Sequence, residues 1–184
     1  MHKKGYVHRD LKLDNILIDP QTKNIKIIDF GFSLKSGPGE KLNVYCGTPH
    51  YMDPDLARKA PYSGMAADIW ACGIILYIIL VGKLPFFAEF EADLFRKIQS
   101  GKYTALPADV CSSKVRGLLN AIFQVDTSRR FTAEQVRLLG ILTQHLLDIE
   151  PPMANRRAKK VEFLRYKRRL INNINSNKST LITF

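Results

Sequence analysis

Two short apolar runs separated by a tight polar turn place the strongest constraint on how this chain folds. The runs occupy residues 15–18 and 25–28, and the turn signal D-P-Q-T follows the first of them, a pattern that predicts a small β-hairpin. Asp10 and Asn15 come at or before the start of the first run, and Asp29 follows the second. Two acids and an amide are therefore expected at one edge of the hairpin. Oxygen ligands of this kind suit Mg²⁺ that bridges the phosphates of a nucleotide.

The residues around these acids form two motifs in a fixed order. The first is H-R-D-L-K-L-D-N at residues 8–15, and the second is D-F-G at residues 29–31. Together they resemble the catalytic loop and the metal-binding loop of eukaryotic protein kinases. The resemblance covers about residues 4–140. It implies a mainly α fold, the C-terminal lobe of a protein kinase with one small β-hairpin at the catalytic loop and without the small N-terminal lobe.

The resemblance also implies a role for each motif residue, with ATP and Mg²⁺ as cofactors. Asp10 would accept the proton of the substrate hydroxyl, and Lys12 would face the γ-phosphate. A lysine two positions after that aspartate is similar to serine/threonine kinases rather than tyrosine kinases. Asn15 and Asp29 would hold Mg²⁺, and Leu17 would form the floor of the adenine pocket. The motif residues that would support the site are His8, Arg9, Phe30 and Gly31.

Residues 32–55 resemble the activation and substrate-docking segment of the kinases. The C-G-T-P-H-Y motif within them is similar to the calcium/calmodulin-dependent and AMP-activated branch. Thr48 of this motif is expected to hydrogen-bond near Asp10 and Lys12, as part of the catalytic set. Two residues before the cysteine, where that branch carries an activating threonine, this chain has Val44.

The missing threonine leaves Arg9 without the phosphothreonine that it pairs with in the family. Between Ser36 and Thr48, the only hydroxyl group belongs to Tyr45. Two interpretations follow. In the first, the segment is always ordered and Glu40 supplies a carboxylate to Arg9; in the second, the segment is never ordered.

Two further acids are expected to be structural. A D-P-D triplet ending at Asp55 stands where the family has A-P-E, whose acid forms a buried ion pair with an arginine near the end of the domain. Arg130 is the implied partner of Asp55. Asp68 begins a long apolar run and needs polar partners. It is either a charge at a helix N-terminus or, as the resemblance implies, a tie to the backbone around His8 and Arg9.

Apolar periodicity predicts the helices that follow. The longest uncharged apolar run, residues 69–82, spans 14 residues, short of the roughly 20 needed to cross a bilayer, so it is predicted to be a buried helix. Another helix is expected to begin near Thr132 with a capping-box-like sequence. The predicted core residues of the helices between them are Leu94, Ile98, Val115, Leu118, Leu119 and Ile122.

The net charge of +11 is concentrated at the C-terminal end. Residues 151–184 hold 9 Lys and Arg against 1 Asp or Glu, and the remaining 150 residues hold 19 against 16. The sequence therefore predicts a lobe at residues 1–150 and a basic, partly disordered tail at residues 151–184. Three cysteines without a C-x-x-C pair indicate reduced thiols in a cytoplasmic protein.

Within the tail, residues 156–171 have apolar residues at helical spacing among the basic ones, which predicts a basic amphipathic helix. Three interpretations stay open: a solvated helix that packs weakly on the lobe, a site for a calmodulin-like partner, or a contact with an anionic membrane surface. Nucleic acid is an unlikely partner of this segment.

Two functions remain from the sequence. The first is an ATP-dependent serine/threonine kinase that acts on a protein hydroxyl. Because the glycine-rich loop, strand lysine and helix glutamate of a kinase are not found before residue 8, the chain is expected to be a truncated domain that is weak or inactive alone. The alternative is a non-catalytic kinase-like binding or scaffold module.

Overall fold

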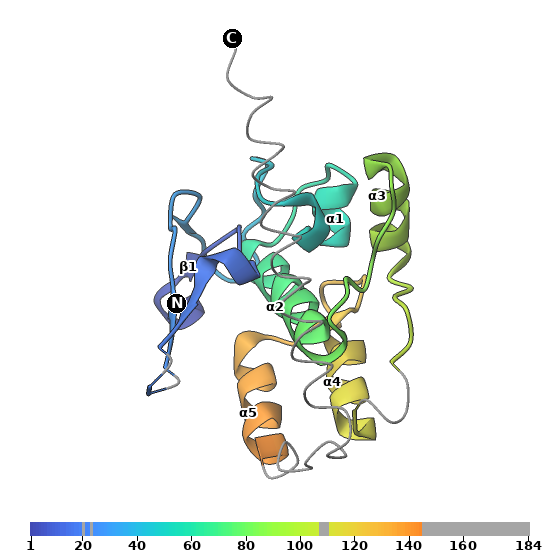
Figure 1. Ribbon diagram of the computed structural model, residues 1–184. Helices are drawn as coiled ribbons and strands as arrows, with labels where there is room; N and C mark the ends of the chain where they lie inside the picture. The colour runs from blue at the N-terminus through green and yellow to red at the C-terminus, as the bar shows by residue number, and fades with distance from the viewer. Residues whose placement is uncertain (20, 23, 107–110, 145–184) are drawn as a thin grey trace.

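The computed structural model describes residues 1–19, 21–22, 24–106 and 111–144 (Figure 1). The helices are α1 (Pro54–Ala57), α2 (Gly64–Val81), α3 (Glu91–Ser100), α4 (Ser113–Ile122) and α5 (Ala133–Gln144). The strands are β1 (Tyr6–Val7), β2 (Ile16–Ile18), β3 (Ile25–Ile27) and β4 (Leu34–Lys35), and the 3₁₀ helices are η1 (His2–Lys4), η2 (Leu13–Asn15) and η3 (Pro49–Tyr51). The mainly α fold is confirmed for these residues. The boundary predicted at residue 150 and the basic tail lie outside them.

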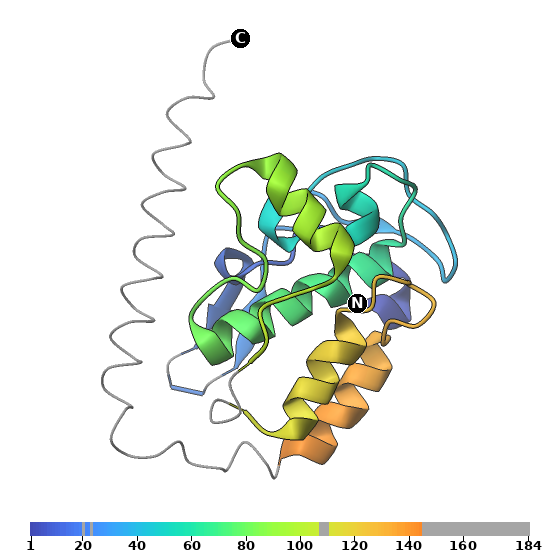
Figure 2. The ribbon, with the colours of Figure 1, turned by 90° about the vertical axis from the view of Figure 1, so that its right-hand side faces the viewer.

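Helix α2 forms the axis around which the other helices pack. The Ser63 side chain accepts the Ala66 N–H at its N-terminus, and Gly82, at φ 75°, ends it. Helices α4 and α5 lie side by side on one side of α2, and α1 and α3 lie on the other (Figure 2). By length and composition α2 could cross a membrane, but Trp70 and Ile74 on it are fully buried in the protein. The predicted buried helix is confirmed.

Close packing between α2 and α4 depends on a glycine. A Cβ atom at Gly73 would lie 2.4 Å from Ile122 Cγ2 and 2.8 Å from the Phe123 ring. Trp70 stacks on Phe86, with ring centroids 5.5 Å apart, and meets the Phe123 ring edge-on. All six core residues predicted from periodicity are buried, so this aromatic layer and the helices around it form the main core.

The predicted hairpin is present as the antiparallel pair β2–β3, in which Ile16 lies opposite Ile27. Asp19 closes its turn by accepting the Gln21 N–H. A second antiparallel ribbon, β1–β4, pairs Val7 with Leu34. This ribbon was not predicted from the sequence, because strands of two residues carry no periodicity.

The N-terminus of α5 has the predicted capping box. Thr132 Oγ1 accepts the Gln135 N–H at 3.3 Å, and Gln135 Oε1 accepts the Thr132 N–H at 2.8 Å. Each side chain thus satisfies a main-chain donor that the first turn of a helix leaves without a partner.

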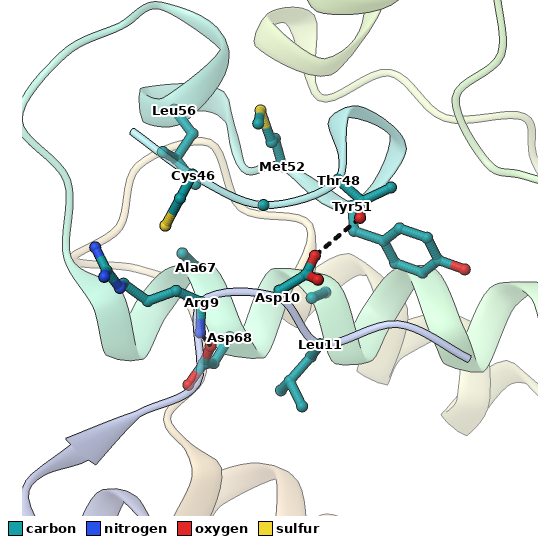
Figure 3. Close-up of a pocket in the computed structure, with 12 residues that line it drawn as sticks. Arg9, Asp10, Leu11, Cys46, Thr48, Tyr51, Met52, Leu56, Ala67 and Asp68 are labelled. Atoms are coloured by element: carbon teal, nitrogen blue, oxygen red, sulfur yellow. Dashed lines mark hydrogen bonds between the residues drawn. The ribbon is translucent and has the colours of Figure 1, made fainter. Parts of the chain in front are cut away.

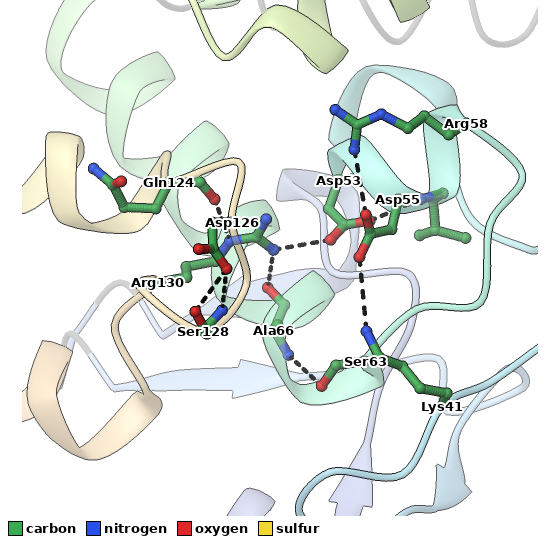
Figure 4. Close-up of polar contacts among 11 residues, drawn as sticks. Lys41, Asp53, Asp55, Arg58, Ser63, Ala66, Gln124, Asp126, Ser128 and Arg130 are labelled. Carbon is green, nitrogen blue, oxygen red and sulfur yellow. Dashed lines mark hydrogen bonds and ion pairs between the residues drawn. The ribbon is translucent and has the colours of Figure 1, made fainter.

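The predicted ion pair between Asp55 and Arg130 is wrong, because Arg130 pairs with Asp53 instead (Figure 4). Arg130 Nη1 lies 2.9 Å from Asp53 Oδ2, and both side chains are fully buried. Asp53 is the N-cap residue of α1 and also accepts the Leu56 N–H. The guanidinium group lies 4.9 Å from the centre of the Trp70 ring, which adds a cation–π contact.

Asp55 has different partners. Its carboxylate lies 3.3 Å from Arg58 and 3.9 Å from Lys41 (Figure 4). The physical reason is the helix geometry: the N-cap side chain folds back over the first turn toward the core, whereas a residue two positions later projects from another side of the helix.

Candidate active site

A buried carboxylate on α2 fixes the start of the catalytic loop, residues 8–15. Asp68, 2% exposed, accepts the His8 N–H at 2.8 Å and the Arg9 N–H at 2.9 Å. The prediction that Asp68 ties the backbone around these residues is confirmed. His2 Nε2 lies 2.8 Å from the same carboxylate. Arg9 has a φ of 69°, an unfavourable backbone conformation for a side chain of this size, and the two main-chain hydrogen bonds stabilise it.

Asp10, Lys12 and Thr48 contact one another, as predicted. Asp10 is 5% exposed, and its carboxylate accepts the Thr48 hydroxyl at 2.8 Å (Figure 3) and the Lys12 ammonium group at 2.7 Å. Lys12 Nζ also donates to Thr48 Oγ1 at 3.0 Å. From the other side, Asn15 Nδ2 donates to the Asp10 main-chain carbonyl at 2.8 Å. Asn15 Nδ2 also lies 3.4 Å from Asp10 Oδ2, so three side chains, those of Lys12, Asn15 and Thr48, contact the carboxylate.

The hairpin brings the last strand back beside Asn15. The Ile28 N–H donates to the Asn15 carbonyl at 3.0 Å, so Asp29 follows directly at the same edge. Asp29 has a φ of 63°, and its Oδ1 accepts the Gly31 N–H at 3.3 Å. The predicted convergence of these motif residues on one edge of the hairpin is thus present in the backbone.

The donor set at this edge fits Mg²⁺. Asn15 uses its amide nitrogen as a donor to Asp10, which leaves the amide oxygen as the atom that a cation would bind, and Asp29 presents an exposed carboxylate. Among the described residues, no three His, Cys, Asp or Glu side chains gather into a metal site. Mg²⁺ is commonly bound by one or two protein ligands together with substrate phosphates and water, so a bound nucleotide would complete the shell.

Apolar side chains beside the hairpin are open to solvent. Leu17, the predicted floor of the adenine pocket, is 52% exposed, and Phe30 is 53% exposed. His8 is fully buried, with its ring centroid 5.0 Å from that of Phe30. The exposed apolar residues in and near the hairpin are Leu17, Ile18, Ile25, Phe30 and Phe32.

Arg9 contacts main-chain carbonyls rather than a carboxylate. Its Nε donates to Phe32 O at 2.6 Å, and its Nη1 donates to Val44 O at 3.3 Å. The predicted pair between Glu40 and Arg9 is wrong, because Glu40 accepts the Gly37 N–H at 2.8 Å within its own turn. The activation segment, residues 37–47, is therefore connected to the catalytic loop without a carboxylate from Glu40.

Sequence reasoning missed two residues that join this segment to the rest of the site. Gly47 has a φ of 108°, and a Cβ there would lie 2.7 Å from Arg9 O, so only glycine allows this close approach. Tyr62 is fully buried and donates its hydroxyl to Val44 O. The glycine lay within the C-G-T-P-H-Y motif, where a backbone role could have been considered, but no sequence signal marks the tyrosine.

A small pocket lies beneath the catalytic loop, lined among others by Asp10, Cys46, Thr48 and Asp68 (Figure 3). Burial raises the pKa of the Cys46 thiol, although the nearby Arg9 charge acts in the opposite direction. A protonated thiol is a poor nucleophile. The Cys46 thiol is therefore not expected to act as a nucleophile.

An oriented aspartate beside a lysine, with an amide and a carboxylate whose oxygens fit Mg²⁺ at the edge of a hairpin, is an arrangement that phosphoryl-transfer enzymes use. Residues 1–138 match the Protein kinase domain family. The chain belongs to the protein kinase family, and by family it is a serine/threonine protein kinase. The predicted resemblance is confirmed.

Three curated relatives illustrate the match. The phosphorylase b kinase gamma catalytic chain, liver/testis isoform, of Homo sapiens is 41% identical over 142 residues, which cover 73% of this chain and 35% of that protein. The SNF1-related protein kinase catalytic subunit alpha KIN12 of Arabidopsis thaliana is 41% identical over 164 residues, 88% of this chain and 32% of that protein. The probable serine/threonine-protein kinase HSL1 of Saccharomyces cerevisiae is 39% identical over 135 residues, 73% of this chain and 9% of that protein. The match thus spans about a third or less of each relative.

Proposed function

We propose that this chain carries the catalytic residues of an ATP-dependent serine/threonine protein kinase, which transfers the γ-phosphoryl group of ATP to a hydroxyl group of a protein. The observation that supports the proposal is the mutual contact of Asp10, Lys12 and Thr48, at 2.7–3.0 Å. A scaffold module would need the fold but not this arrangement of a carboxylate, an ammonium group and a hydroxyl.

Each of these residues has a defined task in the proposal. Asp10 accepts the proton of the substrate hydroxyl as the new bond to phosphorus forms, and a positioned base of this kind is worth roughly a hundred- to ten-thousandfold in rate. Thr48 holds the carboxylate in the orientation that faces the incoming hydroxyl. The Lys12 ammonium group donates to the Asp10 carboxylate and to the Thr48 hydroxyl. It would offset negative charge on the transferred phosphoryl group.

Asn15 and Asp29 are the residues that would hold Mg²⁺, and Leu17 would contact the adenine ring. Bound Mg²⁺ would offset the charge of the nucleotide phosphates. The role of this chain is to fix both oxygen ligands at the edge of the hairpin, through the Asn15 contact with Asp10 and the Asp29 contact with Gly31.

The 184-residue chain by itself is proposed to be weak or inactive. Leu17, the proposed contact of the adenine ring, and Phe30 are each more than half exposed, so the described residues do not cover that side of the proposed nucleotide site. Positioning of reactants supplies roughly 7–11 kcal/mol of rate enhancement in well-built sites. We expect no appreciable transfer from ATP to a serine peptide by the purified chain, and Mg²⁺- and Asp10-dependent transfer would contradict this.

The proposed activity is tested on the native protein, isolated through an epitope in residues 156–171. Its intact mass is measured first, because a mass clearly above 20.9 kDa shows additional chain beside this lobe. Wild-type protein is then compared with Asp10→Asn for transfer to serine and threonine peptides. The substitution is expected to lower kcat by about a hundred- to ten-thousandfold.

A matched control is Asp126→Asn, which makes the same chemical change at an exposed position in the loop before α5. It should retain wild-type kcat. Transfer that does not depend on Asp10, or no transfer by the native protein, would contradict the proposal and favour the scaffold alternative.

The basic segment at residues 156–171 is proposed as a contact for a calmodulin-like partner or an anionic membrane surface, in a cytoplasmic protein. Its charge supports either choice, since 8 of these residues are Lys or Arg and 1 is Glu. Sedimentation with phosphatidylserine vesicles, compared with Ca²⁺-dependent binding to calmodulin, separates the two. Binding to neither would contradict both.

A further inference from the structure

Tyr62 connects the activation segment to the loop that precedes α2. It is fully buried, and its main chain forms a two-way bridge with Leu42: Leu42 N–H donates to Tyr62 O at 2.8 Å, and Tyr62 N–H donates to Leu42 O at 3.1 Å. Its hydroxyl donates to Val44 O at 3.1 Å. A single residue thus makes three hydrogen bonds to residues 42–44.

The Val44 carbonyl is the point at which two donors meet. Arg9 Nη1, from the catalytic loop, approaches it to 3.3 Å, and the Tyr62 hydroxyl approaches it from the loop before α2. Burial raises the pKa of Tyr62, and its proximity to the Arg9 guanidinium partly offsets this shift. The phenol is therefore protonated at neutral pH and can donate to the carbonyl.

Two further contacts connect the activation segment to the residues in and after α1, and neither requires phosphorylation. The Tyr45 hydroxyl donates to Lys59 O at 2.6 Å, and Lys41 Nζ lies 3.9 Å from the Asp55 carboxylate. Asp55 is available for this contact because Asp53, not Asp55, takes the buried Arg130. The D-P-D triplet thus supplies two carboxylates with different partners: Asp53 pairs with the buried Arg130, and Asp55 pairs with Lys41 of the activation segment.

The sequence of the segment explains why such contacts are needed. Residues 37–47 contain no serine or threonine, so no phosphoserine or phosphothreonine can form there to attract Arg9. The side chain at position 44 is a valine that is 66% exposed, and the contact with Arg9 uses its main-chain carbonyl alone. Any residue type at this position would offer the same acceptor, so the contact depends on the two donors, Arg9 and Tyr62.

We propose that Tyr62 is a positioning residue for the kinase reaction: with Arg9, it holds the activation segment at Val44 O and keeps the segment ordered without phosphorylation. This role in the kinase reaction rests on the proposed function. Thr48, which donates to the Asp10 carboxylate, follows Gly47 at the end of this segment. An ordered segment therefore positions the Asp10 carboxylate through Gly47 and Thr48.

The test is hydrogen exchange on the 184-residue chain, followed by NMR at the Leu42 and Tyr62 amides. Tyr62→Phe removes one hydroxyl and keeps the buried ring. Loss of one net hydrogen bond is expected to speed local exchange about fivefold at these amides and at residues 43–48. The matched control is Tyr77→Phe, which removes a hydroxyl that donates to Thr104 O, far from the segment in the sequence and on the core helix.

Tyr77→Phe is expected to leave exchange at residues 42–48 unchanged. Equal exchange in wild type and Tyr62→Phe, or the same change in both variants, would overturn the proposal. The wild-type segment should also be protected when intact mass shows no phosphate, and phosphatase treatment should not alter it. Protection that disappears on phosphatase treatment would overturn it as well.

A double-mutant cycle with Arg9→Gln distinguishes positioning from a general loss of packing. If both donors act on one carbonyl, the effects of Arg9→Gln and Tyr62→Phe on local exchange should be non-additive. Additive effects would overturn the proposal. None of these measurements requires ATP or turnover, so failure here is separate from failure of the Asp10→Asn assay.

Discussion

The catalytic loop and the activation segment are held by opposite kinds of hydrogen bond. In the catalytic loop, two buried carboxylates accept four of the hydrogen bonds: Asp68 accepts two main-chain N–H groups, and Asp10 accepts from a lysine and a threonine. In the activation segment, side chains donate to main-chain carbonyls, as Tyr62 does to Val44 O and Tyr45 does to Lys59 O.

This difference determines how much each set of hydrogen bonds contributes to stability. It also determines how readily each set can be predicted from the sequence. A hydrogen bond to a charged group contributes about 1.5–3 kcal/mol, whereas a neutral one contributes about 0.5–1.5 kcal/mol. A carboxylate anchor also requires a particular residue, which a motif can show. A carbonyl acceptor exists at every residue, so sequence gives no indication of which one is used.

The largest effect should come from Asp53, the buried carboxylate that caps α1. Asp53→Ala leaves Arg130 buried without its counter-ion and removes the N-cap of α1, so we expect a loss of about 3–5 kcal/mol and a melting temperature lower by roughly 10 °C. The matched control is Asp55→Ala, two residues away, whose partly exposed pairs are worth less than about 1 kcal/mol. Calorimetry of both variants that gave equal losses would contradict the assignment of Asp53 as the partner.

A smaller effect is expected for Asp68→Asn, which tests the anchor of the catalytic loop itself. An amide has one oxygen, whereas the His8 and Arg9 N–H groups use both oxygens of the carboxylate. We expect a loss of about 2 kcal/mol in the free energy of unfolding, measured by urea denaturation, with faster exchange at both amides. Asp93→Asn, which removes a charge from an exposed pair with Arg96, should cost less than about 1 kcal/mol. A loss no greater than that of Asp93→Asn would show that the carboxylate anchor is not the stronger one.

The same contrast explains how much of the structure the sequence could predict. The hairpin and the long buried helix followed from apolar runs and turn signals. The contacts of Asp10, Thr48 and Asp68 were implied by the family resemblance, because side chains of motif residues carry the interaction. The partner of Arg130 was predicted wrongly, because D-P-D offers two carboxylates and only the N-cap geometry of α1 decides between them. Of the two interpretations of Arg9, the pair with Glu40 was wrong because the side chain donates to two main-chain carbonyls, at Phe32 and Val44.

The smallest effect concerns a surface contact that links the residues before the catalytic loop to α5. Glu134 lies 2.6 Å from Arg137 and 3.1 Å from Lys3. The Arg137 hydrogen bond, and then that of Lys3, lower the pKa of Glu134 from 4.5 to about 2. Because the folded-state pKa is below the unfolded value, the stabilisation is fully present above pH 4.5 and is lost as the pH falls toward 2.

Glu134→Gln should therefore be slightly less stable than wild type at pH 6, and the difference should shrink steadily between pH 4.5 and the acid end of the range. Urea denaturation at several pH values measures it, and repeating the series in 1 M salt provides the control, since salt screens an exposed pair. A pH-independent difference would mean that packing of the side chain, rather than its charge, stabilises the contact. A loss of stability as large as that of Asp68→Asn would contradict the expected order of effects, because an exposed carboxylate would then stabilise the protein as much as a buried one.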